Sequence, residues 1–215
     1  MDIKAFIFDM DGLLFDSERI VQRSWEMAGD ELGIPHMGDV IYHTLGMNRT
    51  GRNEYFRKYI REDFPFEEFG RLTRDNFWKI VDKEGLPLKK GAKELLAYGK
   101  SQGYKMAVAT SSSREYAMGN LIRAGIDSHF DSVVCGDMVK KAKPDPEIYQ
   151  KACESLGIQP EYCMAFEDAP GGILSAHQAG MQVIMVPDLV QPTQEIRELT
   201  YRVCDSLADV IGILN

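Results

Sequence analysis

Two carboxylates stand two positions apart, directly after a short apolar run near the start of the chain. Asp9 and Asp11 follow the run Ile3–Phe8, and Gly12 comes next. Alternate residues of an extended segment point to the same side, so both carboxylates can face one site, and Gly12 allows the chain to turn away with positive φ. Like charges held this close need a cation or a proton between them, and Mg²⁺ suits such oxygens. The pair therefore predicts a magnesium site, and capping of the following segment is the structural alternative.

Three further segments carry groups that suit a phosphate ester. Thr110-Ser111-Ser112 offers hydroxyl and N–H groups at a strand-to-helix junction, Lys143 precedes a helix in a proline-stiffened loop, and Glu167-Asp168 is a second acidic pair after an apolar run. Taken singly, the hydroxyls and acids could be helix caps and the lysine a solvated charge. Together they provide phosphate-binding donors, a cation and metal-binding acids beside Asp9. Phosphoryl transfer depends mainly on such positioning and charge neutralisation.

The spacing of the apolar runs indicates how these residues come together. Continuous runs, rather than alternating ones, are typical of strands buried on both faces of a parallel sheet. The predicted strands are Ile3–Phe8, Met106–Ala109, Val133–Cys135, Met164–Phe166 and Val183–Val186. Helical patterns separate the later runs, namely Arg114–Ala124, Pro146–Leu156 and Gly171–Ala179. Strands that alternate with helices predict an α/β fold with a doubly wound parallel sheet, in which ligands bind beyond the carboxyl ends of the strands. Those ends carry Asp9, Thr110, Asp137, Glu167, Asp168 and Asp188.

The distance between the first two strands is too long for a simple crossover. The first ends at Asp9 and the second begins near Lys105, whereas a crossover needs only about 10–12 residues, which Gly91–Gln102 can supply. The stretch 16–80 shows helical apolar stripes and contains both tryptophans. We therefore expect a small α-helical domain at 16–80, inserted into a core formed by 1–15 and 81–215.

Four segments, in order, resemble the signature motifs of the haloacid dehalogenase superfamily: FDMDGLLFDSE, ATSSS, KPDP and FEDAPGG. The helical insertion after the first motif is similar to the cap of the β-phosphoglucomutase-like branch of small-phosphosugar phosphatases and mutases. The resemblance spans nearly the whole chain and implies a Rossmann-like core with a cap. The second aspartate of the first motif separates the chain from the metal-independent dehalogenases of the superfamily.

The resemblance also implies roles for individual residues. Asp9 would attack phosphorus to form an aspartyl-phosphate, and Asp11 would act as general acid and then general base. Thr110 and the Ser111 N–H would bind the transferring phosphoryl group, with Ser112 beside them, and Lys143 would neutralise charge between Asp9 and the phosphate. Mg²⁺ would be held by Asp9, the backbone carbonyl of Asp11, Asp168 and Glu167, the last directly or one step behind.

Three functions follow: a Mg²⁺-dependent phosphatase of a small phosphorylated metabolite, a phosphosugar mutase and a phospho-acceptor signalling domain. The phosphatase is preferred. Mutases of this branch carry a histidine where this chain has Val21, which favours transfer to water. Arg49 stands near the place where mutases hold a distal phosphate, and could instead orient a single polar substrate or lie on the surface. Glu18 is close enough in sequence to contact substrate hydroxyls. A phospho-acceptor signalling domain uses similar residues, but such domains are shorter and have no inserted cap.

Composition excludes several other classes. The chain has 215 residues, a hydrophobic fraction of 44% and a net charge of −8, from 33 acidic and 25 basic residues. This composition argues against disorder, nucleic-acid binding and attachment to an anionic membrane. No apolar run reaches the ~20 residues of a membrane span, and 1–15 lacks the pattern of a secretory signal. The four cysteines show no CxxC pair. We expect a cytoplasmic protein, with a monomer as the simplest state.

Overall fold

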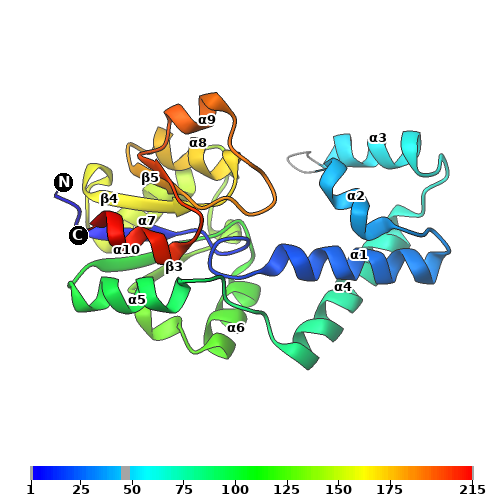
Figure 1. Cartoon of the computed structure of the whole chain (residues 1–215), viewed down its shortest axis with the longest axis horizontal. Coiled ribbons are helices and arrows are strands. Elements are labelled where there is room, and N and C mark those ends of the chain that lie inside the picture. The colour runs from blue at the N-terminus through cyan, green and yellow to red at the C-terminus, as the bar shows by residue number, and fades with distance from the viewer. Residues whose placement is uncertain (1, 45–48, 215) are drawn as a thin grey trace. The chain divides into compact units, whose positions relative to one another are not determined.

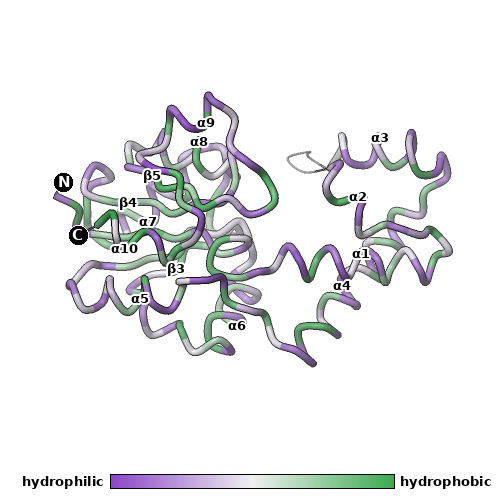
Figure 2. Tube along the Cα trace, in the orientation of Figure 1, coloured by the Kyte–Doolittle hydropathy of each residue, from purple (hydrophilic) through white to green (hydrophobic). Residues whose placement is uncertain are grey.

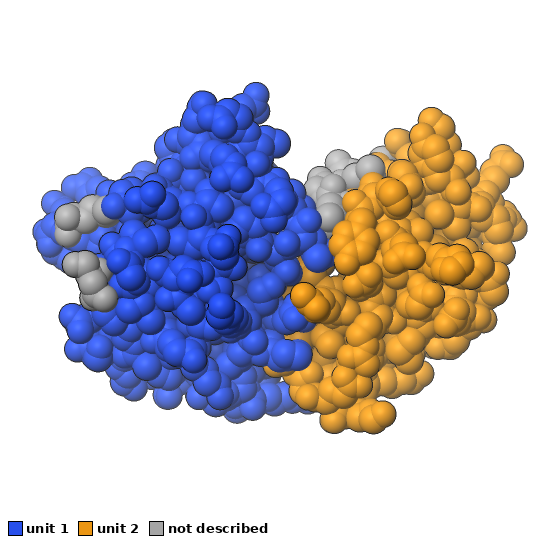
Figure 3. Space-filling model, viewed as in Figure 1, with its two compact units in different colours: residues 1–16, 87–215 blue, residues 17–86 orange. Residues whose placement is uncertain are grey.

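The computed structural model describes residues 2–44 and 49–214, with the side chains of residues 49 and 50 outside that description. It divides into two compact units (Figure 3). Unit 1 comprises residues 1–16 and 87–215, and unit 2 comprises residues 17–86. The second boundary lies beyond the expected position at residue 80, because the last helix of unit 2 continues to Glu84.

Unit 1 is built on a six-stranded, wholly parallel sheet with the strand order β3-β2-β1-β4-β5-β6 (Figure 1). The strands are β1 (Ala5–Phe8), β2 (Lys105–Ala109), β3 (Ser132–Val134), β4 (Cys163–Glu167), β5 (Gln182–Met185) and β6 (Arg202–Val203). The predicted doubly wound α/β fold is confirmed. Five strands match the predicted runs to within one or two residues, whereas the short edge strand β6 was not expected. The order of strands reverses at β1, so the switch point lies between β1 and β4.

Helices cover both faces of this sheet. They are α5 (Ala92–Ser101), α6 (Arg114–Ala124), α7 (Glu147–Leu156), α8 (Pro170–Gln178), α9 (Gln194–Glu198) and α10 (Leu207–Leu214), with short 3₁₀ turns η1 (Asp127–His129), η2 (Gly136–Met138) and η3 (Pro160–Tyr162). The alternate strand residues Ile7 and Ala165 pack with Ile148 of α7 and Ile173 of α8. On the other face α5 approaches so closely that a side chain at Gly99 would meet Phe6 and Met106. The strands are therefore buried on both sides, as their continuous apolar runs require.

A few local signals fix where α6 and α7 begin and end. Gly125 and Gly157 adopt the left-handed conformation directly after α6 and α7, which confirms the expected helix ends. Ser113 caps α6 by accepting a hydrogen bond from the Tyr116 N–H at 3.4 Å. Helix α7 begins at Glu147 rather than at Pro146, and the Asp145 carboxylate accepts from the Glu147 N–H at 3.1 Å. Ser113 and Asp145 therefore fix where the loops at the carboxyl edge begin α6 and α7.

Unit 2 consists of four helices: α1 (Ser17–Leu32), α2 (Met37–Thr44), α3 (Arg49–Tyr59) and α4 (Phe66–Glu84). Helix α1 packs against α2 and α4, and hydrophobic and hydrophilic residues alternate along it in Figure 2. The Trp25 ring packs edge-on against Phe56 and Phe69, with ring centroids 5.6 and 5.5 Å away. The expected helical insertion thus has its own aromatic core. Over the described residues, none of the helices is both long enough and apolar enough to cross a bilayer.

Candidate active site

Three carboxylates meet at the carboxyl edge of the sheet, at the switch point between β1 and β4. Asp9 directly follows β1, Glu167 is the last residue of β4, and Asp168 comes next. The two strands pair in register, with Phe8 opposite Phe166, and the Asp9 N–H donates to the Phe166 carbonyl at 3.0 Å. One carboxylate oxygen from each of the three residues lies within 4.8 Å of the others. The strand register therefore brings together acids that lie far apart in the sequence.

Lys143, in the loop before α7, contacts two of these carboxylates. Its Nζ donates to Asp9 Oδ1 at 2.5 Å, to Glu167 Oε1 at 2.7 Å and to the Ala109 carbonyl at 3.0 Å. Only 10% of the Lys143 side chain is exposed. The loop is tied down because the Ser175 hydroxyl of α8 donates to the Asp145 carbonyl at 2.6 Å. Lys143 is thus a fixed, nearly buried cation that bridges β1 and β4.

Burial and charge perturb the titration of this group. Burial raises the pKa of the Asp9 carboxyl from 3.8 to about 7; the Lys143 ammonium opposes this rise and the Glu167 carboxylate adds to it. For Lys143, burial alone would lower the pKa, but the Asp9 and Glu167 carboxylates outweigh burial and raise it. Lys143 therefore stays charged near neutral pH, whereas Asp9 is poised between its neutral and ionised forms until a further cation favours the ionised one.

Asp11 is held by hydrogen bonds from α6 and the loop before it. The Ser112 hydroxyl donates to Asp11 Oδ2 at 2.8 Å, and the Tyr116 hydroxyl donates to Oδ1 at 3.1 Å. Gly12 follows with φ +83°, the left-handed conformation that the sequence predicts there. A Cβ at Gly12 would also collide with the Asp168 carboxylate. The glycine therefore serves both the turn and the close approach of Asp168.

Thr110 and Ser111 directly follow β2, whose last residue, Ala109, accepts a hydrogen bond from Lys143. Thr110 is 1% exposed, its N–H donates to the Val134 carbonyl at 3.0 Å, and its hydroxyl accepts from the Ser112 N–H at 3.1 Å. Ser111 is exposed. Because Lys143 donates to the carbonyl of the neighbouring Ala109, the end of β2 lies against the same group of charges. On the β2 side, the Ser112 hydroxyl is therefore a donor to a carboxylate of the site, that of Asp11.

The donor set fits a divalent cation. Asp9, Glu167 and Asp168 provide carboxylate oxygens at short mutual distance, while Lys143 neutralises only part of their charge. Carboxylates so close together need a further cation or a proton. Oxygen-only donors match the preference of Mg²⁺. Asp9, Glu167 and Asp168 are the residues that could hold the ion.

Comparison with known proteins agrees with this geometry. Residues 6–186 match the sequence profile of the haloacid dehalogenase-like hydrolases. The chain belongs to this family. It is 32% identical over 212 residues to a putative phosphatase, YhcW, of Bacillus subtilis, covering 97% of this chain and 94% of that protein. It is 32% identical to a phosphorylated carbohydrates phosphatase of Thermotoga maritima, over 85% and 84% of the two chains. The crystal structure of a putative beta-phosphoglucomutase from Thermotoga maritima superposes with a TM-score of 0.83 at 27% identity, covering 99% and 98%.

Within this haloacid dehalogenase-like hydrolase, the structure brings together six of the residues singled out in the sequence, all at one edge of unit 1: Asp9, Asp11, Thr110, Lys143, Glu167 and Asp168. Ser112 lies with them through its contact to Asp11. Glu18 is in the first turn of α1 in unit 2. Arg49 begins α3, and its side chain lies outside the described residues. The substrate contacts of Glu18 and Arg49 stay predictions.

The structure adds three site residues that sequence reasoning missed. The Tyr149 hydroxyl of α7 is fully buried and donates to Glu167 Oε1 at 2.6 Å; burial, with the Glu167 and Asp9 carboxylates, raises its pKa well above 10. Tyr116 donates to Asp11. Lys89 pairs with Asp188 beyond β5 at 2.7 Å. The sequence predicted the helices that contain Tyr116 and Tyr149 but gave no indication that either tyrosine belongs to the site. Asp188, the partner of Lys89, was among the residues predicted at strand ends.

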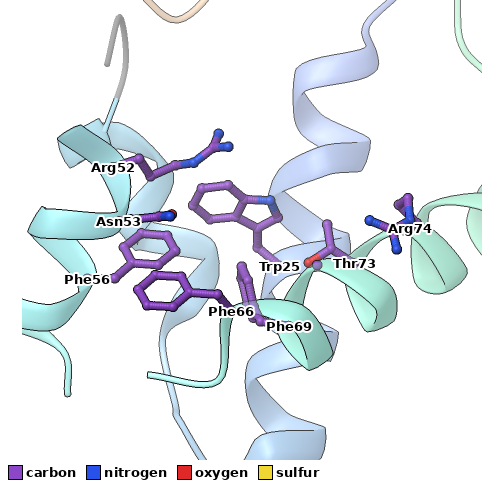
Figure 4. A pocket seen from close by; sticks show the side chains of 9 residues that line it. Trp25, Arg52, Asn53, Phe56, Phe66, Phe69, Thr73 and Arg74 are labelled. Atoms are coloured by element: carbon purple, nitrogen blue, oxygen red, sulfur yellow. The ribbon is translucent and has the colours of Figure 1, made fainter. Parts of the chain in front are cut away.

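Unit 2 contains a pocket of about 340 Å³ whose lining combines aromatic rings with polar groups (Figure 4). It is lined by Trp25, Arg52, Asn53, Phe56, Phe66, Phe69, Gly70, Thr73 and Arg74. The Arg52 guanidinium lies 5.8 Å from the centroid of the Trp25 ring. The Thr73 hydroxyl oxygen is buried and has no hydrogen-bond partner among the described residues. The aromatic residues of this insertion thus serve both as its core and as a pocket wall.

Proposed function

We propose that the protein is a Mg²⁺-dependent phosphatase that hydrolyses a small phosphomonoester, such as a sugar phosphate, through an aspartyl-phosphate. The observation that carries this proposal is the grouping of Asp9, Glu167 and Asp168 around Lys143 at the switch point of the sheet. The family and the relatives named as phosphatases support the same chemistry.

In the first step Asp9 attacks phosphorus. Lys143 occupies Oδ1, and no hydrogen bond within the described part of the chain occupies Oδ2, which is the oxygen we assign as nucleophile. A bond forms between this oxygen and phosphorus while the ester P–O bond breaks, and Asp11 gives its proton to the departing alkoxide. Ser112 and Tyr116 hold the Asp11 carboxyl in one orientation for this transfer.

In the second step water replaces the aspartyl oxygen. Asp11, now ionised, takes a proton from the water, whose oxygen bonds to phosphorus, and the bond between phosphorus and Asp9 breaks. The Lys143 ammonium stabilises the charge that returns to Asp9. Mg²⁺, when held by Asp9, Glu167 and Asp168, would supply further positive charge for the phosphoryl oxygens.

Unit 2, taken by itself, has in this proposal a carbohydrate-binding role. A pocket with an aromatic wall, a guanidinium and an unpartnered hydroxyl suits the polyol face of a phosphorylated carbohydrate. Thr73→Val keeps the shape and removes the hydroxyl. We expect it to raise the KM for a sugar phosphate and to leave hydrolysis of an aryl phosphate unchanged; equal effects on both would contradict the role of the pocket.

A phosphosugar mutase is the second candidate, supported by the structural similarity to a putative beta-phosphoglucomutase. The two functions differ in their product. In a screen of phosphomonoesters, the protein should release inorganic phosphate with Mg²⁺ and not with EDTA. This release should require no bisphosphate activator. Asp9→Asn should abolish this release. A phosphorylated product formed only after addition of a sugar bisphosphate would establish the mutase instead.

A further inference from the structure

A second ion pair lies beside the carboxylate group and plays no part in the proposed steps. Lys89 Nζ is 2.7 Å from Asp188 Oδ1 and 3.9 Å from Asp16 Oδ1. Asp188 follows β5, the neighbour of β4, and only 7% of its side chain is exposed. Lys89 is itself anchored, since its N–H donates to the Leu14 carbonyl at 2.9 Å. The pair is therefore a built, nearly buried feature of unit 1.

The other oxygen of Asp188 is buried and lacks a hydrogen-bond partner among the described residues. It faces the carboxylate group across Gly12: a Cβ built on Gly12 would lie 3.5 Å from Asp188 Oδ2 and 2.9 Å from Asp168 Cγ. A buried carboxylate oxygen without a donor is costly. The charge of Lys89 offsets part of this cost on Oδ1 only. Asp188 Oδ2 therefore needs a donor that occupies the space beside Asp168.

Asp188 lies too far out to be a direct ligand of the same ion. Asp9, Glu167 and Asp168 each place a carboxylate oxygen within 4.8 Å of the other two, and Asp188 lies outside this group. Mg²⁺ keeps several waters in protein sites, and carboxylates behind the ligands commonly orient what the ion holds. A water of the hydration shell is a donor of the right kind for Asp188.

We propose that Asp188 is a positioning residue for Mg²⁺: its Oδ2 accepts a hydrogen bond from a water of the ion's hydration shell, and Lys89 holds the carboxylate in that orientation. This inference rests on the proposed function, because it requires that the protein bind Mg²⁺ at Asp9, Glu167 and Asp168.

The test is calorimetric titration of Mg²⁺ into the full chain without substrate. Asp188→Asn preserves shape and removes the charge, and we expect the Kd for Mg²⁺ to rise about 10- to 100-fold. Lys89→Met should raise the Kd less, since the carboxylate remains. Lys105→Met is the matched control, because Lys105 pairs with Asp131 at 2.9 Å at the start of β2, away from the carboxyl edge; its Kd should equal that of the wild type.

Thermal unfolding in EDTA separates this role from a structural one. If the pair only anchors the loop after β5, Asp188→Asn and Lys89→Met should both lower Tm and leave the Kd for Mg²⁺ unchanged. That result would overturn the inference. If Asp188→Asn fails to fold, an unchanged Kd for Lys89→Met alone would overturn it. Asp168→Asn distinguishes this failure from failure of the proposed function. If the wild-type protein binds no Mg²⁺, or if Asp168→Asn binds it with the wild-type Kd, the metal site of the proposed function is wrong.

Discussion

The raised pKa of Asp9 makes the stability of the metal-free protein depend on pH in a direction opposite to that of most carboxylates. Burial raises this pKa from 3.8 to about 7. Between these values the folded protein holds a proton on Asp9 that the unfolded chain has released, so the contribution of Asp9 to the free energy of unfolding falls as pH rises from 4 to 7 and does not change above 7. A difference of roughly 3 pKa units corresponds to about 4 kcal/mol.

Asp9→Asn removes the titrating group and keeps the shape of the side chain. In EDTA, urea unfolding at a series of pH values should therefore show the variant gaining stability relative to the wild type as pH rises from 4 to 7. The total relative change should be about 4 kcal/mol, with no further change above pH 7.

Asp131→Asn provides a matched control with the opposite sign. Burial of Asp131 is outweighed by hydrogen bonds from Lys105 and the Met106 N–H, which lower the pKa of its carboxyl. Wild-type stability relative to this variant should therefore be lost as pH falls through the acid range. Parallel stability curves for Asp9→Asn and the wild type between pH 4 and 7 would refute the assignment of the proton to Asp9.

Three further substitutions test contacts at the site and in the core of unit 2. Tyr149→Phe removes the hydrogen bond to Glu167 and should lower the free energy of unfolding by about 2 kcal/mol, measured by urea denaturation. Gly172→Ala places a Cβ against the Glu167 carboxylate, so calorimetry should show weaker Mg²⁺ binding; unchanged binding would mean that Glu167 does not hold the ion. Trp25→Ala empties the aromatic core of unit 2 and should cost about 3–5 kcal/mol of unfolding free energy; a cost below that range would show that the neighbouring rings repack.

The carboxyl edge of the sheet could be predicted because it depends on local signals. Apolar runs define the strands, and the residue after each run is placed at one edge by the parallel fold alone. Asp9, Thr110 and Asp168 were therefore located without tertiary information. The domain insertion was predictable for a similar reason, since its length exceeds what a crossover needs.

The residues that were not predicted act through contacts that the sequence does not encode locally. Tyr149 is one of several apolar positions on α7, and only the approach of α7 to β4 gives its hydroxyl a partner in Glu167. In the sequence, Lys89 cannot be told from a solvated lysine. Only the fold brings it within 2.7 Å of Asp188. The extension of α4 to Glu84 was missed because the helical pattern weakens after Ile80, while packing of Val81 against Ile20 keeps that turn helical.

The central claim is that Asp9 forms a covalent bond to phosphorus, and mass spectrometry tests it most directly. Asp11→Asn should slow release of phosphate, so acid quenching during turnover of a phosphomonoester with Mg²⁺ should trap one phosphoryl group on the peptide that contains Asp9. The Asp9→Asn, Asp11→Asn double variant should trap none. A phosphoryl group on another residue, or phosphate release by Asp9→Asn at the wild-type rate, would contradict the account.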